Sequence, residues 1–152
     1  MKNLWLFIFC ITMALSAKAQ KPNPDYDAAL AKELGADDYG MKQYILVMLK
    51  TGTNTTATKA ESDTAFAGHM ANMGKLVKEN KLIVAGPIGK NDKNYRGIFI
   101  LNVKTIEDAK EILATDPAVK AKLLAADLFN WYGSAALAEY LKASEKVGKF
   151  KF

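Results

Sequence analysis

QYILVMLK, the stretch at residues 43–50, is apolar at odd and even positions alike. Its density of Ile, Val, Leu and Tyr is typical of a β-strand, in which neighbouring side chains point to opposite faces of the sheet. Residues 97–103, GIFILNV, have the same character. The sequence therefore predicts a sheet that is covered on both faces.

The segments around these two strands alternate between helical and extended patterns. Phe66, Met70, Met73 and Val77 form an apolar stripe at helical spacing. The other expected elements are a loop over 50–59, the helix carrying that stripe over 63–80, a strand over 82–85, a helix opened by Thr105 and ended by Asp116, a turn over 117–123 and a strand over 127–132. The order is β-α-β-β-α-β, the ferredoxin-like pattern of an α+β domain.

The second face of this sheet needs a cover of its own. Helices account for one face, and the other face of an antiparallel sheet usually meets water. Here both strands are apolar on that face too, and an exposed apolar surface of this size is an association site. A second subunit's sheet is the simplest cover, so we expect a homodimer.

Shorter segments flank the domain at residues 42–133. Residues 20–41 form a leader in which Asp25 is expected to cap a short helix that stops at Gly35. Residues 134–152 are expected to form a C-terminal helix and a tail.

The first 19 residues have the layout of a signal peptide. Lys2 supplies a positive charge, residues 4–17 form an apolar run, and Ala17, Lys18 and Ala19 form an A-x-A cleavage pattern before Gln20. The run is shorter than the ~20 residues that span a bilayer. We expect a periplasmic or secreted protein with no stable membrane insertion after cleavage.

The charge pattern argues against nucleic-acid binding. Without Lys2 and Lys18 the chain has 19 basic and 16 acidic residues, a net charge of +3, and Arg96 is its only arginine. Nucleic-acid binders cluster Lys and Arg on one face and favour Arg for bidentate contacts. The scattered lysines here indicate a solvated surface.

Several kinds of chemistry are absent from the sequence. Cys10 is the only cysteine and would leave with the signal peptide, so no disulfide, thiolate nucleophile or cysteine metal site is expected. The chain has no dinucleotide or phosphate loop, no nucleophile elbow and no H-E-x-x-H motif. The sequence indicates no cofactor and no metal.

His69 is the only histidine. On a helical wheel it lies at the shoulder of the apolar stripe, beside Met73 and Leu76, which predicts an imidazole that is half covered and half reachable. A histidine side chain ordinarily titrates near neutrality, where a general acid or base is most effective. The alternative is a histidine that simply hydrogen-bonds to nearby backbone.

Four short motifs follow one another at a recognisable spacing. They are His69 followed by hydrophobic residues at helical spacing, KLIVAGP at 81–87, a Gly-led strand from 97 and TDP at 115–117. Together they resemble the YciI-like (YCII-related) family over about residues 42–133. The resemblance implies the fold of a dimeric α+β barrel.

The same resemblance implies a histidine–aspartate site at His69 and Asp116. A carboxylate on one imidazole nitrogen fixes the tautomer and makes the other nitrogen a better base. Such a base could remove a proton from an aromatic or enolic substrate, as in eliminations of the dehydrochlorinase type associated with the family. Asp116 also has a structural alternative as a helix cap, and one carboxylate could serve both roles.

Tyr95, Arg96 and Trp131 are further candidates for contacting a small-molecule ligand. Aromatic residues near strand ends are also common as core or dimer contacts. The sequence favours an acid–base, lyase-like activity on a small organic molecule. The alternatives are a non-catalytic binding module and a structural dimer whose pocket is no longer used.

Overall fold

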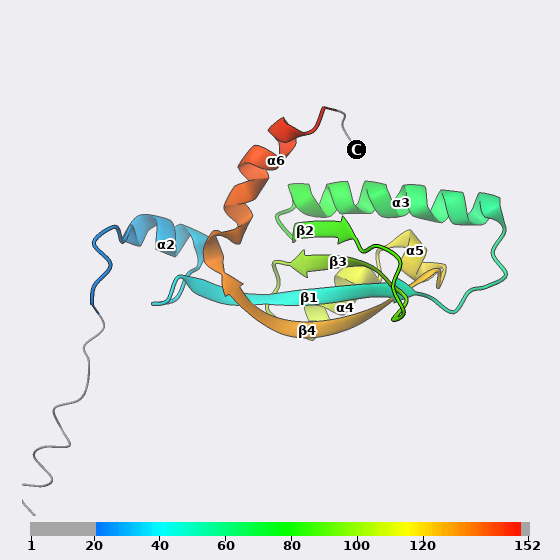
Figure 1. Ribbon diagram of the computed structural model, residues 1–152, viewed down its shortest axis with the longest axis horizontal. Coiled ribbons are helices and arrows are strands. Elements are labelled where there is room, and N and C mark those ends of the chain that lie inside the picture. The colour runs from blue at the N-terminus through cyan, green and yellow to red at the C-terminus, as the bar shows by residue number, and fades with distance from the viewer. Residues whose placement is uncertain (1–20, 150–152) are drawn as a thin grey trace, which may run out of the picture.

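A computed structural model of the chain describes residues 21–149 (Figure 1). Four strands form one antiparallel sheet in the order β2-β3-β1-β4. They are β1 (Met41–Thr51), β2 (Leu82–Pro87), β3 (Tyr95–Leu101) and β4 (Leu124–Ser134). The prediction of a mixed α+β domain is confirmed. The predicted signal peptide at 1–19 lies outside the described residues.

Helices connect the strands, and others precede β1 and follow β4. They are α2 (Ala28–Leu34), α3 (Lys59–Lys78), α4 (Ile106–Leu113), α5 (Pro117–Lys120), the 3-10 helix η1 (Ala135–Tyr140) and α6 (Leu141–Val147). Figure 1 shows α3 running beside β2, where the two elements are in contact. Within the described part of the chain, no helix is long and apolar enough to span a membrane.

The main core lies between the sheet and helices α3, α4 and α5. Alternate residues of β1 point into it, namely Ile45, Val47 and Leu49. They meet Leu76 of α3 and Ile112 of α4. This layer fixes α3 and the α4–α5 connection on the same face of the sheet, and that arrangement positions the site.

Helix α3 begins four residues earlier than the sequence pattern predicted. Thr58 is its N-cap: the Thr58 side chain accepts a hydrogen bond from the Glu61 backbone, and the Glu61 carboxylate accepts one from the Thr58 backbone at 2.8 Å. This reciprocal pair is a capping box, which stabilises a first turn. The Thr-rich composition of the preceding loop hid it.

Strands β1, β2 and β4 also extend further than predicted, whereas β3 begins at Tyr95 and ends at Leu101 rather than at residue 103. All eleven residues of β1 pair with β4, from Met41 opposite Ser134 to Thr51 opposite Leu124. Strand β2 continues through Pro87, although Gly86 and Pro87 were expected to stop it. Because β2 is at the edge of the sheet, the missing N–H of proline costs no ladder bond there.

The flanking segments differ from the prediction in one cap and in one helix. The α2 N-cap is Asp27 rather than Asp25, and its carboxylate accepts from the backbone of Ala29 and Leu30. Gly35 ends α2 in the left-handed conformation, as expected. The expected C-terminal helix is split into η1 and α6.

The second face of the sheet is covered in part by the chain itself. Tyr44, Ile83 and Ile100 are buried there. Residues of η1 and α6 pack against them, namely Leu137, Ala138 and Leu141. The prediction that a second subunit covers this whole face is wrong for the end that the C-terminal segment covers.

The other end of this face is less completely covered within the described residues. Leu46 pairs with Phe129, and Met48 pairs with Ile98, so these four side chains share the face. Phe129 is 51% exposed. An apolar surface therefore remains open beside the C-terminal segment.

Candidate active site

His69 lies on the buried side of α3 rather than at its shoulder. The buried residues of α3 are Ala65, His69 and Leu76, whereas Met70 is 44% exposed. The predicted orientation of the helix was therefore wrong for His69 and Met70. Phe66, Met73 and Val77 pack against the core and also line a cleft, and a sequence pattern does not distinguish these two apolar surroundings.

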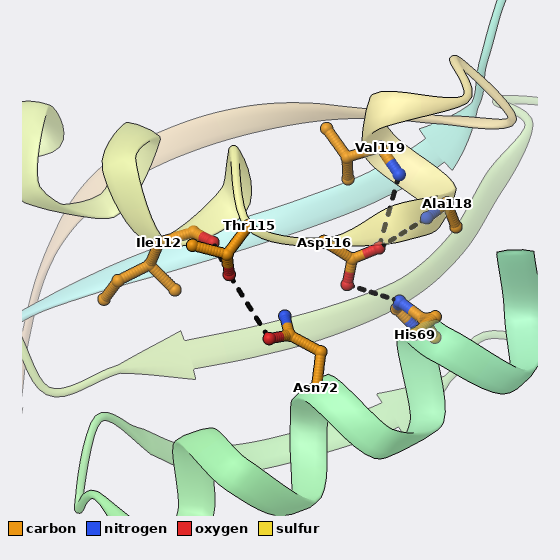
Figure 2. Close-up of polar contacts among 7 residues, drawn as sticks. All are labelled: His69, Asn72, Ile112, Thr115, Asp116, Ala118 and Val119. Carbon is orange, nitrogen blue, oxygen red and sulfur yellow. Dashed lines mark hydrogen bonds and ion pairs between the residues drawn. The ribbon is translucent and has the colours of Figure 1, made fainter.

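Nδ1 of His69 lies 2.7 Å from Oδ2 of Asp116 (Figure 2). Asp116 is the N-cap of α5, and its other oxygen, Oδ1, accepts from the backbone N–H of Ala118 at 2.9 Å and of Val119 at 3.3 Å. One carboxylate thus caps a helix with one oxygen and holds an imidazole with the other.

The Asp116 carboxyl is 1% exposed, yet it favours its ionised form. Burial alone raises the pKa of Asp116, but the hydrogen bond and positive charge of His69 lower it, with help from the backbone N–H of Val119 and Ala118. The net effect is a lowered pKa. An ionised Asp116 only accepts hydrogen bonds, so the proton between the two side chains belongs to Nδ1 of His69.

The other ring nitrogen, Nε2, is the one that a ligand can reach. No hydrogen bond occupies it among the described residues. Among the described side-chain nitrogen and oxygen atoms, only Asn72 Nδ2 is both buried and unpaired. Because Nε2 of His69 is unpaired and is not in that class, it is in contact with solvent. A neutral imidazole with its proton on Nδ1 carries a lone pair on Nε2, which can accept a proton.

A cleft of about 570 Å³ opens between α3 and the β2–β3 side of the sheet, with His69 in its wall. Apolar side chains make most of its lining, and the members are Leu49, Phe66, His69, Met70, Met73, Gly74, Val77, Leu82, Ala85, Gly86, Pro87, Arg96, Gly97, Phe99 and Leu124. Among residues 21–149, no group of three or more His, Cys, Asp or Glu side chains is placed to hold a metal ion.

Two phenylalanines hold the imidazole ring in place. The ring stacks on Phe99 with centroids 5.8 Å apart and planes inclined by 20°. Phe66 meets it edge-on at 6.1 Å. The sequence placed Phe66 in the apolar stripe of the helix and Phe99 in a strand, and it predicted no contact of either residue with His69. The three-residue spacing of Phe66 and His69 on one helix was the available signal for the first contact.

The three lesser candidates are placed differently. Arg96 lines the cleft, as expected. Tyr95 is not part of the lining, and its backbone is held by the side chain of Asn91. Trp131 lies on the opposite face of the sheet, 5.6 Å from the ring of Tyr44, because it pairs with Tyr44 across the β1–β4 ladder. The structure does not bring Trp131 to the cleft.

Comparison with known proteins identifies the domain. The sequence model of the YCII-related domain matches residues 44–131, more than half of the chain. Among solved structures, a similar one is the 5-chloro-2-hydroxyhydroquinone dehydrochlorinase from Burkholderia phenoliruptrix AC1100 in complex with 2,5-dihydroxybenzoquinone. The two chains are 21% identical with a TM-score of 0.41, over 57% of this chain and 92% of the other. No curated protein matches the sequence.

Proposed function

Because the chain belongs to the YCII-related domain family, we propose that His69 and Asp116 form an acid–base centre that moves a proton on a small organic molecule. Asp116 holds the proton on Nδ1, and Nε2 accepts a proton from an acidic O–H or C–H of the substrate. The 2.7 Å contact between the two side chains, at the wall of a cleft, is the observation that carries this proposal.

A lyase-like elimination is the reaction class that this centre serves best. When Nε2 takes the proton, the electron pair left on the substrate forms a new double bond and expels a leaving group such as chloride. The proton on the imidazolium then passes to solvent, so the substrate loses one molecule of acid in total. No oxidant or reductant is required.

The cleft suits an apolar, compact substrate. Phe66 and Phe99 flank the imidazole, and Met70, Met73 and Val77 continue the apolar wall. When a bound substrate displaces water from such a wall, its polar interactions with the few charged groups of the cleft become stronger. Arg96 is the charged residue of the lining that would contact an anionic group of the substrate.

A binding module without catalysis is the second candidate. It is favoured by the small exposed fraction of His69, which is 8%. In that case Nε2 donates or accepts one hydrogen bond to a ligand, and no bond of the ligand is broken.

Two properties of the whole protein belong to this proposal. We propose that the chain is exported to the periplasm or beyond after cleavage before Gln20. We also propose that it forms a homodimer through the open end of the second sheet face, around Phe129.

A paired binding and turnover screen tests the function. Chlorinated hydroxyaromatic and enolic compounds would be ranked by thermal shift with the wild-type protein and with His69→Gln. Chloride release would then be measured for every compound that binds. We expect release by the wild type and at least a 100-fold slower release by His69→Gln, in line with the ~10²–10⁴-fold contribution of a general base. Binding without release in the wild type would favour the binding module.

A further inference from the structure

The connection between α4 and α5 touches α3 at three successive points. Pro117 lies against Gly68, Asp116 contacts His69, and Thr115 lies 3.2 Å from the Asn72 side chain. Figure 2 shows Thr115 and Asp116 both facing α3. The distance between His69 and Asp116 therefore depends on how closely this connection approaches α3.

Gly68 is the point of closest approach. A Cβ added at this position would lie 2.7 Å from Cγ and 3.1 Å from Cβ of Pro117. Real Cβ atoms essentially never come closer than 3.0 Å to another heavy atom, so one side would have to move. Glycine is also among the least favourable residues inside a helix, and at Gly68, unlike at Gly74, a close contact supplies a packing reason for it.

The opposite side of this contact cannot yield easily. Pro117 is the first residue of α5 and follows the cap residue Asp116 directly. Its ring locks the backbone φ angle, and the Asp116 carboxylate is held by the backbone of Ala118 and Val119. The proline ring and the Asp116 carboxylate are therefore held together as one unit. The spacing between Gly68 and Pro117 then determines the distance between the His69 imidazole and this carboxylate.

We propose that Gly68 is a positioning residue for the His69–Asp116 pair: its lack of a side chain lets α3 settle onto Pro117 and closes the imidazole onto the carboxylate. The proposal rests on the proposed function only in assigning that pair a role. A methyl group at Gly68 needs a displacement of about 0.3 Å to clear the 3.0 Å limit and of about 0.7 Å to restore ordinary contact, which begins near 3.4 Å. Transmitted in full, the larger displacement lengthens the 2.7 Å contact to about 3.4 Å, outside the range of about 2.7–3.2 Å for N–H···O hydrogen bonds.

The test compares Gly68→Ala with Gly74→Ala. Both substitutions replace a glycine of α3 by the best helix former, but a Cβ at Gly74 has nothing within 4 Å. Because His69 is the only histidine, its imidazole signals in ¹⁵N-labelled protein are assigned without ambiguity. We expect the hydrogen-bonded Nδ1–H resonance in the wild type and in Gly74→Ala, and its loss in Gly68→Ala.

A second signal reports on the carboxylate. Loss of the contact removes the hydrogen bond that lowers the pKa of Asp116, so this pKa should rise in Gly68→Ala and stay unchanged in Gly74→Ala. An unchanged Nδ1–H resonance and an unchanged Asp116 titration in Gly68→Ala would overturn the proposal.

A double variant decides the case in which Gly68→Ala does not fold. Pro117→Ala removes the Cγ that would lie 2.7 Å from the new methyl group and keeps only the Cβ, at 3.1 Å, so Gly68→Ala with Pro117→Ala should fold and regain the Nδ1–H resonance. A double variant that stays unfolded, or folds without the resonance, contradicts the proposed contact. All readouts concern the pair and not turnover, so a protein that keeps the pair but acts on no compound contradicts the proposed function alone.

Discussion

Asp116 is the residue on which the site and the local fold both depend. Its Oδ1 caps α5 and its Oδ2 holds His69. Asparagine at this position can still accept hydrogen bonds from the backbone, so it preserves most of the cap. It loses the negative charge that stabilises a protonated imidazole. The two roles can therefore be separated by one substitution.

The first prediction concerns the pKa of Asp116. In His69→Gln, burial still raises this pKa, but the charge of the imidazole and its hydrogen bond no longer lower it. We expect the Asp116 pKa to be higher in the variant, measured by ¹³C NMR titration of the carboxyl groups. Asp37, whose pKa is lowered mainly by a hydrogen bond from Tyr132, is an internal control that should not change. Equal Asp116 titrations in the two proteins would show that His69 does not interact with this carboxylate.

The second prediction concerns stability in acid. The pKa of Asp116 is lower in the folded protein than its ordinary value of 3.8. Its ionised form therefore contributes stability above about pH 4, and this contribution is lost as the pH falls through the folded pKa. The wild type should be more stable than Asp116→Asn at pH 6, and the difference in unfolding free energy should shrink by pH 2. Urea unfolding at several pH values measures it, and a difference that does not vary with pH would contradict the assignment.

The sequence predicted the members of the pair but not their setting. His69 and Asp116 were identified from short motifs around each residue, and their contact follows from the β-α-β-β-α-β order that brings α3 beside the α4–α5 connection. The depth of His69 was not predictable, because the apolar pattern placed Met70 in the core although it is exposed at the edge of a cleft. Phe99 joins the site through packing between a helix and a strand, which leaves no local pattern.

At the scale of elements, α3 depends on its capping box for a defined start. The helix has 20 residues. Leu76, which packs in the core, lies near its C-terminal end, far along the helix from the first turn. The sequence does contain the signal, since Thr58 and Glu61 have the required spacing. The start of the helix was predicted from its apolar stripe, and the first four residues contain no part of that stripe. The capping box was therefore not predicted.

The third prediction follows from this cap. Thr58→Ala removes the side chain that accepts from the Glu61 backbone, and it should lower the free energy of unfolding by about 1 kcal/mol. Thr55→Ala, in the loop just before, is the matched control and should change stability much less. Chemical denaturation of both variants provides the comparison. Equal losses would mean that the capping box adds nothing to the stability of the fold.

For the whole molecule, the decisive feature is a sheet face that is only partly covered. The sequence predicted the apolar character of this face correctly, because the central residues of β1 and β3 are apolar at odd and even positions alike. It could not predict that η1 and α6 cover Tyr44 and Ile100, since the pattern of residues 134–152 indicates a helix but not where it docks.

The fourth prediction concerns assembly through the open end of that face. Wild-type protein should sediment as a dimer at micromolar concentration. Phe129→Asp places a charge in the centre of the open surface and should yield a monomer that remains folded. Tyr39→Asp, at a residue that is 70% exposed outside this face, should remain dimeric. A wild-type protein that sediments as a monomer would contradict the proposed dimer.

The fifth prediction concerns export. Protein recovered from outside the cytoplasm of its native host should begin at Gln20, because the A-x-A pattern ends at Ala19. Intact-mass spectrometry distinguishes this product from the full chain. Recovery of exported protein that retains residues 1–19 would contradict the predicted cleavage.

The double role of Asp116 also affects how sequence drift at this site should be interpreted. A lineage that no longer needed the chemistry would still keep Asp116, because selection for a folded protein preserves the cap of α5. His69 caps no helix, so the fold constrains this position less strictly than it constrains Asp116. Retention of the aspartate in a relative is therefore weak evidence for activity. A relative that keeps the aspartate but has lost the histidine carries the signature of a site that has fallen out of use.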